Sequence, residues 1–246
     1  AMENPATACQ TAKELFHSGF PHDALQRLRI GLEETPDAGQ IWELYGVIQH
    51  AQQAFSEALG ALETATTLRP LSLGGQLALA DCYRRSDAHQ TAESMFQHLA
   101  RRPDLPRQYV PDIVCGLAAV GDYPTALELS RKIAEQDPTC VQALYGTAYY
   151  MARCGYPTEL VIPIMRHVVQ LAPHELRFRV ALGMLHQTAG QNDMAYQVVV
   201  KISCEQLATL NCRRCLYQFA DLFETRGDET RRCVCLVRAR ALREED

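Results

Sequence analysis

The residues with the clearest potential for chemistry are four cysteines near the end of the chain. Cys212 and Cys215 form a C-x-x-C pair, and Cys233 and Cys235 form a C-x-C pair. Four thiolates can bind Zn²⁺ tetrahedrally, and a C-x-x-C pair can carry redox chemistry. On a helix, however, residues two positions apart are rotated by about 200°. We therefore expect no metal here and keep a metal-binding or redox role of this cluster as an alternative.

Motifs typical of enzymes are missing from the sequence. It contains no phosphate-binding glycine-rich loop and no G-x-S-x-G motif. His174-Glu175 does not continue into H-E-x-x-H, because Leu176, Arg177 and Phe178 follow it. The eight histidines are dispersed along the chain. We therefore expect a protein that is not an enzyme and that needs no cofactor.

The composition indicates a folded chain and argues against nucleic acid and membranes as partners. Of 246 residues, 47% are hydrophobic, enough for a sizeable core. The net charge is -5, so no general basic field attracts the phosphates of a nucleic acid. The longest apolar stretch, residues 143–152, is far shorter than the roughly 20 residues that span a bilayer. We expect neither a nucleic-acid partner nor a membrane partner.

The cysteines also bear on the cellular compartment. Ten of them are scattered through a chain that is large enough to fold without disulfides, and no secretion signal is visible. This pattern favours reduced thiols and a cytoplasmic location.

The sequence contains a repeat, which predicts the helices that hold any functional residue in place. Prolines recur at Pro36, Pro70, Pro103, Pro138 and Pro173, which by subtraction are 34, 33, 35 and 35 positions apart. A small residue precedes each of the first four prolines by 11 or 12 positions, at Ala24, Ala58, Ala92 and Ala126. Between the expected helices of a pair, turns are marked by Gly19, Gly121, Gly155, Gly190 and Gly227. A period of this length indicates a solenoid of helical hairpins.

The clearest unit spans residues 39–72 and identifies a family resemblance. It carries Trp42, Tyr45, Gly46, Ala58, Leu62, Ala65 and Pro70. This unit resembles the tetratricopeptide repeat, whose pattern is W-x2-L-G-x2-Y, then A-x3-F, then P. Tyr45 replaces the leucine of that pattern, and Gln49 replaces its first tyrosine. Gly46 and Ala58 are small where paired helices approach most closely, and Trp42 fills the space beside them.

The resemblance implies an all-α fold, a right-handed superhelical solenoid of about seven helix-turn-helix repeats with about 14 helices. We interpret the chain as one domain over residues 1–246. The expected repeats are 5–38, 39–72, 73–106, 107–140, 141–175, 176–209 and 210–246. The last repeat has a charged end and is interpreted as a cap.

The resemblance also implies a function, because the first helices of such repeats line a groove that accepts peptides. Proteins of this family generally act as scaffolds, adaptors or co-chaperones, so we expect another protein or a peptide as the partner. The family's groove positions, transferred to this sequence, predict partner-binding roles for Glu43, Val47, His50, Leu77, Asp81, Arg84, Tyr145, Tyr149, Arg153, Arg177, Met184 and Gln187.

Tyr145 and Tyr149 lie one helical turn apart and are the predicted hot spot, with Arg153 a further turn along to bind a carboxylate. The alternative is that both tyrosines pack against a neighbouring repeat. The Arg84-Arg85 pair could contact an anion, or it could be solvated or cap its helix.

Two more specific hypotheses concern the N-terminal repeats. Relatives that bind chaperone tails clamp the terminal carboxylate with Lys and Asn, but the matching positions here hold Cys9, Lys13, Glu43 and Val47. Only Lys13 has suitable chemistry, so that activity is not expected. Self-association is the other alternative, because Phe16 and Phe20 lie in a weakly matching first repeat, where an apolar helix face could remain exposed.

Overall fold

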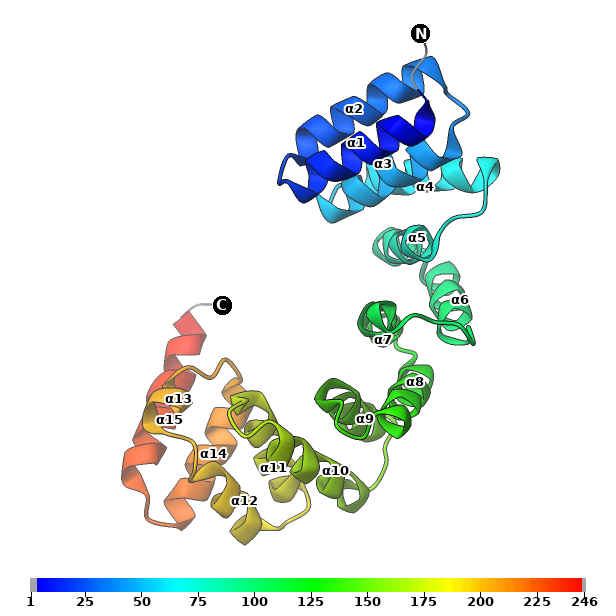
Figure 1. Ribbon diagram of the computed structural model, residues 1–246. Coiled ribbons are helices and arrows are strands. Elements are labelled where there is room, and N and C mark those ends of the chain that lie inside the picture. Colours follow the sequence, from blue (N-terminus) through cyan, green and yellow to red (C-terminus); the bar gives the residue numbers. More distant parts are fainter. Residues whose placement is uncertain (1–3, 245–246) are drawn as a thin grey trace. The chain divides into compact units, whose positions relative to one another are not determined.

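The computed structural model describes residues 4–244, which form fifteen α-helices and one 3-10 helix and contain no β-strand (Figure 1). The chain divides into two compact units, Ala1–Ala126 and Leu127–Asp246, and the division falls inside α8 (Tyr123–Gln136). We describe each unit by itself.

Unit 1 consists of helix pairs in chain order. Its elements are α1 (Pro5–His17), α2 (Pro21–Glu34), α3 (Gly39–Ala51), α4 (Phe55–Leu68), α5 (Leu73–Arg85), α6 (His89–Ala100), η1 (Arg107–Tyr109) and α7 (Val110–Ala119). The first helix of each pair also packs on the next first helix, so that α1 contacts α3, α3 contacts α5 and α5 contacts α7. These contacts place the first helices side by side.

Unit 2 contains the remaining helices. They are α9 (Val141–Arg153), α10 (Thr158–Leu171), α11 (Leu176–Thr188), α12 (Asn192–Val199), α13 (Cys204–Ala208), α14 (Arg213–Thr225) and α15 (Glu229–Glu244). The five-residue helix α13 has no counterpart in the predicted hairpins. It begins with a capping box, in which Ser203 and Gln206 hydrogen-bond to each other's backbone N–H groups.

The turns within pairs are built on one residue with a left-handed backbone. All five glycines predicted at turns have a positive φ, between 69° and 86°. Gln53 and Asp87 have φ values of 62° and 63° in the turns that follow α3 and α5. The turn geometry is therefore the same, although glycine occupies only part of these places.

Small residues form the core where paired helices cross. Ala24, Ala58, Ala92 and Ala126 are completely buried, as their spacing predicts. Trp42 packs against the buried cluster that contains Ala58 and Leu62, and its Nε1 donates to Pro36 O at 2.8 Å. The expected neighbourhood of Trp42 and Ala58 is therefore confirmed.

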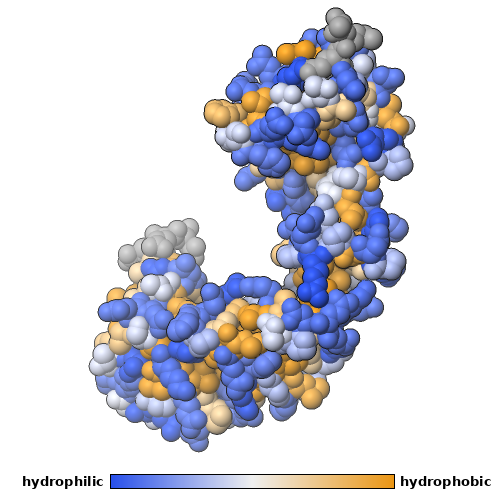
Figure 2. Space-filling view, viewed as in Figure 1, coloured by the Kyte–Doolittle hydropathy of each residue, from blue (hydrophilic) through white to orange (hydrophobic). Residues whose placement is uncertain are grey.

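The surface is mixed rather than uniformly polar. On the face shown in Figure 2, hydrophobic residues in orange are interspersed with hydrophilic residues in blue. Phe16 packs against the first core cluster, whereas Phe20 is 55% exposed. Only one of the two phenylalanines considered for self-association therefore presents an accessible ring.

Substitution of two glycines tests the helix crossing. A Cβ added at Gly46 would lie 2.6 Å from Leu62 Cγ and 3.2 Å from Ala58 O, whereas one added at Gly60 would meet nothing within 4 Å. We expect Gly46→Ala to lower the free energy of unfolding by about 1 to 3 kcal/mol. Gly60→Ala should raise it by about 0.5 to 1 kcal/mol, because alanine restricts the unfolded chain.

Both variants can be compared with the wild type by urea denaturation. Ala58→Leu, at the same crossing, should behave like Gly46→Ala. Equal effects at positions 46 and 60 would contradict the close approach of α3 and α4.

Candidate functional site

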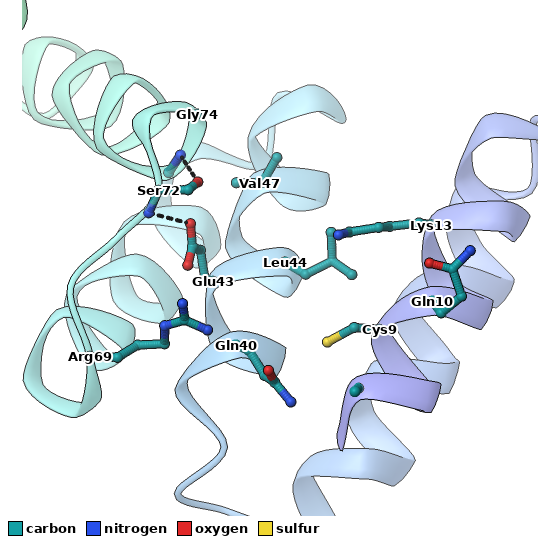
Figure 3. A pocket seen from close by; sticks show the side chains of 12 residues that line it. Cys9, Gln10, Lys13, Gln40, Glu43, Leu44, Val47, Arg69, Ser72 and Gly74 are labelled. Atoms are coloured by element: carbon teal, nitrogen blue, oxygen red, sulfur yellow. Dashed lines mark hydrogen bonds between the residues drawn. The ribbon is translucent and has the colours of Figure 1, made fainter. Parts of the chain in front are cut away.

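A cavity of about 450 Å³ opens on the first helices of unit 1. Its walls come from α1, α3, the end of α4 and the start of α5 (Figure 3). The lining residues are Ala6, Cys9, Gln10, Lys13, Gln40, Glu43, Leu44, Val47, Arg69, Ser72, Gly74 and Gly75. We call this space the α1/α3/α5 cavity.

Glu43 forms a fixed part of the cavity wall. Its side chain is buried, and Oε1 accepts a hydrogen bond from Ser72 N at 2.9 Å (Figure 3). Ser72 caps α5, because its Oγ accepts from Gly75 N at 3.1 Å. A Cβ at Gly75 would lie 2.5 Å from Glu43 Oε1, so glycine makes room for this carboxylate. Glu43 therefore joins one repeat to the next.

Two cations give the cavity its positive character. Figure 3 shows Lys13 on the α1 side and Arg69 on the α4 side. Among residues 4–244 neither forms an ion pair with a carboxylate, while the one lining carboxylate is held by a backbone N–H. Burial raises the pKa of the Cys9 thiol, and Lys13 and Arg69 offset only part of this effect. Cys9 is therefore a neutral, protonated wall residue.

Three predicted binding residues contact one another at the far end of α3. His50 Nε2 donates to Asp81 Oδ2 at 2.8 Å, and Arg84 Nε donates to Asp81 Oδ1 at 2.9 Å. Arg85 Nε also donates to Asp81 Oδ2 at 2.9 Å, and its guanidinium lies 3.9 Å from the centre of the Phe55 ring. Both arginines of the Arg84-Arg85 pair lie in the last turn of α5 and hold Asp81.

Asp81 is stabilised as the carboxylate. Partial burial alone would raise its pKa, but hydrogen bonds from His50, Arg85 and Arg84 outweigh burial and hold the pKa of Asp81 well below its usual range. The network ties α5 to the end of α3 within unit 1.

In unit 2, aromatic rings gather on α9 and α11. The Tyr145 ring lies 4.9 Å from that of Phe178 and 6.2 Å from that of Tyr149. The Arg177 guanidinium lies 5.7 Å from the centre of Tyr145 and 4.7 Å from that of Phe178. We call Tyr145, Tyr149, Arg177 and Phe178 the α9/α11 aromatic surface.

The two predicted hot-spot tyrosines have different environments. Tyr145 packs on Phe178 of the next hairpin, and burial raises the pKa of its hydroxyl despite the opposing charge of Arg177. Tyr149 is 44% exposed and meets Tyr150 edge-on. Packing against a neighbouring repeat therefore describes Tyr145, whereas Tyr149 remains accessible.

The other predicted residues support the cores, bond to a neighbouring repeat or lie on the helix surface. Val47 lines the cavity and packs on the α4–α6 core, and Met184 packs on the unit 2 core. Gln187 Nε2 donates to Gln218 O of α14 at 3.0 Å. Leu77 is half-buried on α5, and Arg153 is exposed at the end of α9.

Sequence reasoning left several lining residues out of the predicted set. Cys9 and Lys13 occupy the α1 places that match Glu43 and Val47, so the same spacing could have included them. Arg69 and Ser72 come from the connection between α4 and α5, for which helical periodicity provides no signal.

The cysteine cluster differs from the expectation of reduced thiols. Cys212 and Cys215 form a disulfide, and the other eight cysteines are free. Cys233 is exposed and Cys235 is buried, in line with their expected opposite directions on a helix. Among the described residues no group of His, Cys, Asp or Glu is arranged to hold a metal ion. Within the same part of the chain, no helix has the length and hydropathy needed to cross a membrane.

Known proteins that are similar to this chain are also built from helical repeats. Residues 9–72 match a family model described as tetratricopeptide repeat. A tetratricopeptide repeat protein from Parabacteroides merdae superimposes with a TM-score of 0.66 at 15% identity, over 97% of this chain and 93% of the other. The C-terminal part of a tetratricopeptide repeat-containing protein from Cytophaga hutchinsonii superimposes with a TM-score of 0.68 at 11% identity, over 97% of this chain and 96% of the other.

A third structure is similar over a shorter part of the chain. YrrB, described as a tetratricopeptide repeat protein with an unusual peptide-binding site, gives a TM-score of 0.58 at 17% identity, over 78% of this chain and 100% of that one. No curated protein sequence is recognisably similar to the chain. The helices and these likenesses confirm the predicted all-α repeat solenoid.

The Asp81 network generates a prediction of pH dependence. We expect Asp81→Asn to lower the free energy of unfolding by about 1 to 2 kcal/mol near pH 7, because charge-assisted hydrogen bonds at a partly exposed site are lost. The pKa of Asp81 is depressed in the folded state, so its contribution is present above the unfolded pKa of about 3.9 and is lost as the pH falls further. The difference between wild type and variant should therefore shrink below about pH 4.

Urea denaturation at several pH values measures this difference. Asp104→Asn is the control, because Asp104 is exposed and pairs only with nearby Arg102 among the described residues. It should change stability little at any pH. A stability loss in Asp81→Asn that is the same near pH 7 and near pH 3 would show that the charge of Asp81 is not what stabilises α5.

Proposed function

We propose that this chain, which belongs to the tetratricopeptide repeat family, is a scaffold or adaptor that holds a segment of another polypeptide on the first helices of its repeats. The observation that carries the proposal is the α1/α3/α5 cavity, formed by consecutive first helices of unit 1. The role needs no catalysis and no cofactor, because binding is the whole function.

The chemistry of the cavity favours a peptide segment with an acidic side chain. Lys13 and Arg69 supply positive charge, while Gln10 and Gln40 offer amide groups that can pair with an extended backbone. Leu44 and Val47 add an apolar part of the lining against which an aliphatic side chain can pack. The similarity in fold to YrrB, which is described as having an unusual peptide-binding site, supports a peptide as the partner.

The α9/α11 aromatic surface is proposed as a second contact with the partner. Tyr149 presents an accessible ring, and Arg177 stacks beside Tyr145 with its own side chain 53% exposed. Aromatic rings and arginine are the residue types that most often dominate protein interfaces. A second copy of this chain is the alternative partner.

We propose a cytoplasmic location, which the eight free cysteines favour. The negative net charge makes a nucleic-acid partner unsuitable.

Charge reversal in the cavity tests the first contact. Peptides are selected from a random library on the intact wild-type protein, and their affinity is measured by calorimetry or fluorescence anisotropy. We expect micromolar binding, about −8 kcal/mol, and acidic residues among the selected peptides. Lys13→Glu and Arg69→Glu should each weaken binding at least about tenfold, because attraction becomes repulsion.

Lys132→Glu is the matched control, since Lys132 is an exposed residue of α8 outside the cavity. Helical content measured by circular dichroism confirms that each variant folds. Selected peptides that bind the Lys13→Glu and Arg69→Glu variants as well as they bind the wild type would refute the cavity as the binding site.

Removal of an exposed ring tests the second contact. Tyr149→Ala should capture less of each partner from a lysate of the source organism, because about 1 to 2 kcal/mol of binding free energy is lost. The free energy of unfolding should change little. Tyr156→Ala is the control, because Tyr156 is similarly exposed at 38% but lies in the turn before α10. Light scattering on the same samples distinguishes a bound partner from a second copy of the chain. Equal capture by both variants would exclude the aromatic surface.

A further inference from the structure

The only disulfide among residues 4–244 joins two residues at the start of a helix. Cys212 is the N-cap of α14, and Cys215 lies in its first turn. The bridge closes a loop with a sequence separation of 3. Bridges that close short loops stabilise a fold less than those that close long ones. This bridge should therefore contribute little to the stability of the fold.

The two sulfurs differ in accessibility. Cys212 is exposed, whereas Cys215 is 9% exposed and belongs to the core cluster that also contains Leu216, Phe219 and Cys235. Cys212 is therefore the more accessible half of the bridge for a thiolate from solution, and Cys215 is the protected half. This asymmetry makes Cys212 the sulfur that exchanges with external thiols and Cys215 the sulfur that closes the bridge again.

The surroundings of Cys212 favour a thiolate once the bridge is open. Cys212 Sγ accepts a hydrogen bond from Cys215 N at 3.2 Å, at the positive end of the α14 dipole. Arg213 and Arg214 follow directly in sequence. The Nε of Arg213 is buried and has no hydrogen-bond partner within the described part of the chain. Thiolates beside arginines at helix N-termini are the reactive ones.

The chain around the bridge is held by other contacts. Arg238 of α15 donates from Nε to Leu210 O at 3.0 Å and from Nη2 to Asn211 Oδ1 at 2.5 Å. Leu207 is completely buried in the same core cluster. The connection from α13 to α14 is therefore anchored by contacts that do not involve the two sulfurs.

We propose that Cys212 and Cys215 form a redox-active pair that exchanges its disulfide with thiols through Cys212 while unit 2 stays folded. An incoming thiolate attacks Cys212 Sγ, a new disulfide forms to the reductant, and the electron pair leaves on Cys215 Sγ, which takes a proton. With a dithiol reductant, its second thiolate attacks its own bridged sulfur, closes a cyclic disulfide and releases Cys212. The dithiol loses two electrons and two protons, and the pair becomes two thiols.

Alkylation under native conditions tests the proposal on the full chain. The protein is treated with dithiothreitol, trapped with iodoacetamide and mapped by peptide mass spectrometry, with circular dichroism on the same sample. We expect Cys212 to become alkylated with unchanged helical content, while the buried Cys215 becomes alkylated only after denaturation. In a sample that is not trapped, the pair should bridge again after removal of the dithiol. A pair that opens only in denaturant, or only with loss of helix, would show a structural bridge and overturn the proposal.

Single substitutions test the asymmetry and need no binding partner, so their outcome is independent of the proposed scaffold function. In Cys215→Ser, Cys212 should form a mixed disulfide when glutathione disulfide is added. Near pH 7 it should also react with iodoacetamide at least about tenfold faster than the exposed Cys233 in the same chain. In Cys212→Ser, Cys215 should form no mixed disulfide. Equal rates for Cys212 and Cys233 would also overturn the proposal.

Discussion

The close approach of paired helices at small residues is the constraint on which the other features depend. Gly46 faces Leu62 with no space for a Cβ, and Gly183 faces Val199 in the same way. A helical hairpin of about 30 residues buries too little apolar surface to be stable alone. Tight crossings fix the orientation of each hairpin, so that its remaining apolar surface packs on the next one.

That constraint also determines which side chains are available for binding. Within unit 1 the second helices cover the backs of the first helices, and α1, α3 and α5 pack on one another through neighbouring contacts. The inner face of these three helices is therefore continuous, and the α1/α3/α5 cavity lies where their polar side chains leave space. A larger residue at Gly75 would displace Glu43 and so alter the cavity wall.

The sequence was sufficient for features that depend on volume and periodicity. The burial of Ala58 beside Trp42 and the positive φ of Gly121 follow from spacing and residue type alone. Features that depend on the path of a connection could not be predicted in this way. Arg69 enters the cavity from the connection between α4 and α5. The disulfide requires that α14 begins after Cys212, a boundary that periodicity does not define.

The predicted groove positions divide into two physical roles. Glu43, Asp81 and Gln187 make hydrogen bonds that join one repeat to the next. A partner that used these groups would have to break buried or charge-assisted hydrogen bonds, which costs free energy. Lys13 and Tyr149 are exposed and take no part in these bonds between repeats. Recognition of a partner therefore falls to side chains beside the anchors, because a solenoid must satisfy its own polar contacts before its surface can serve another chain.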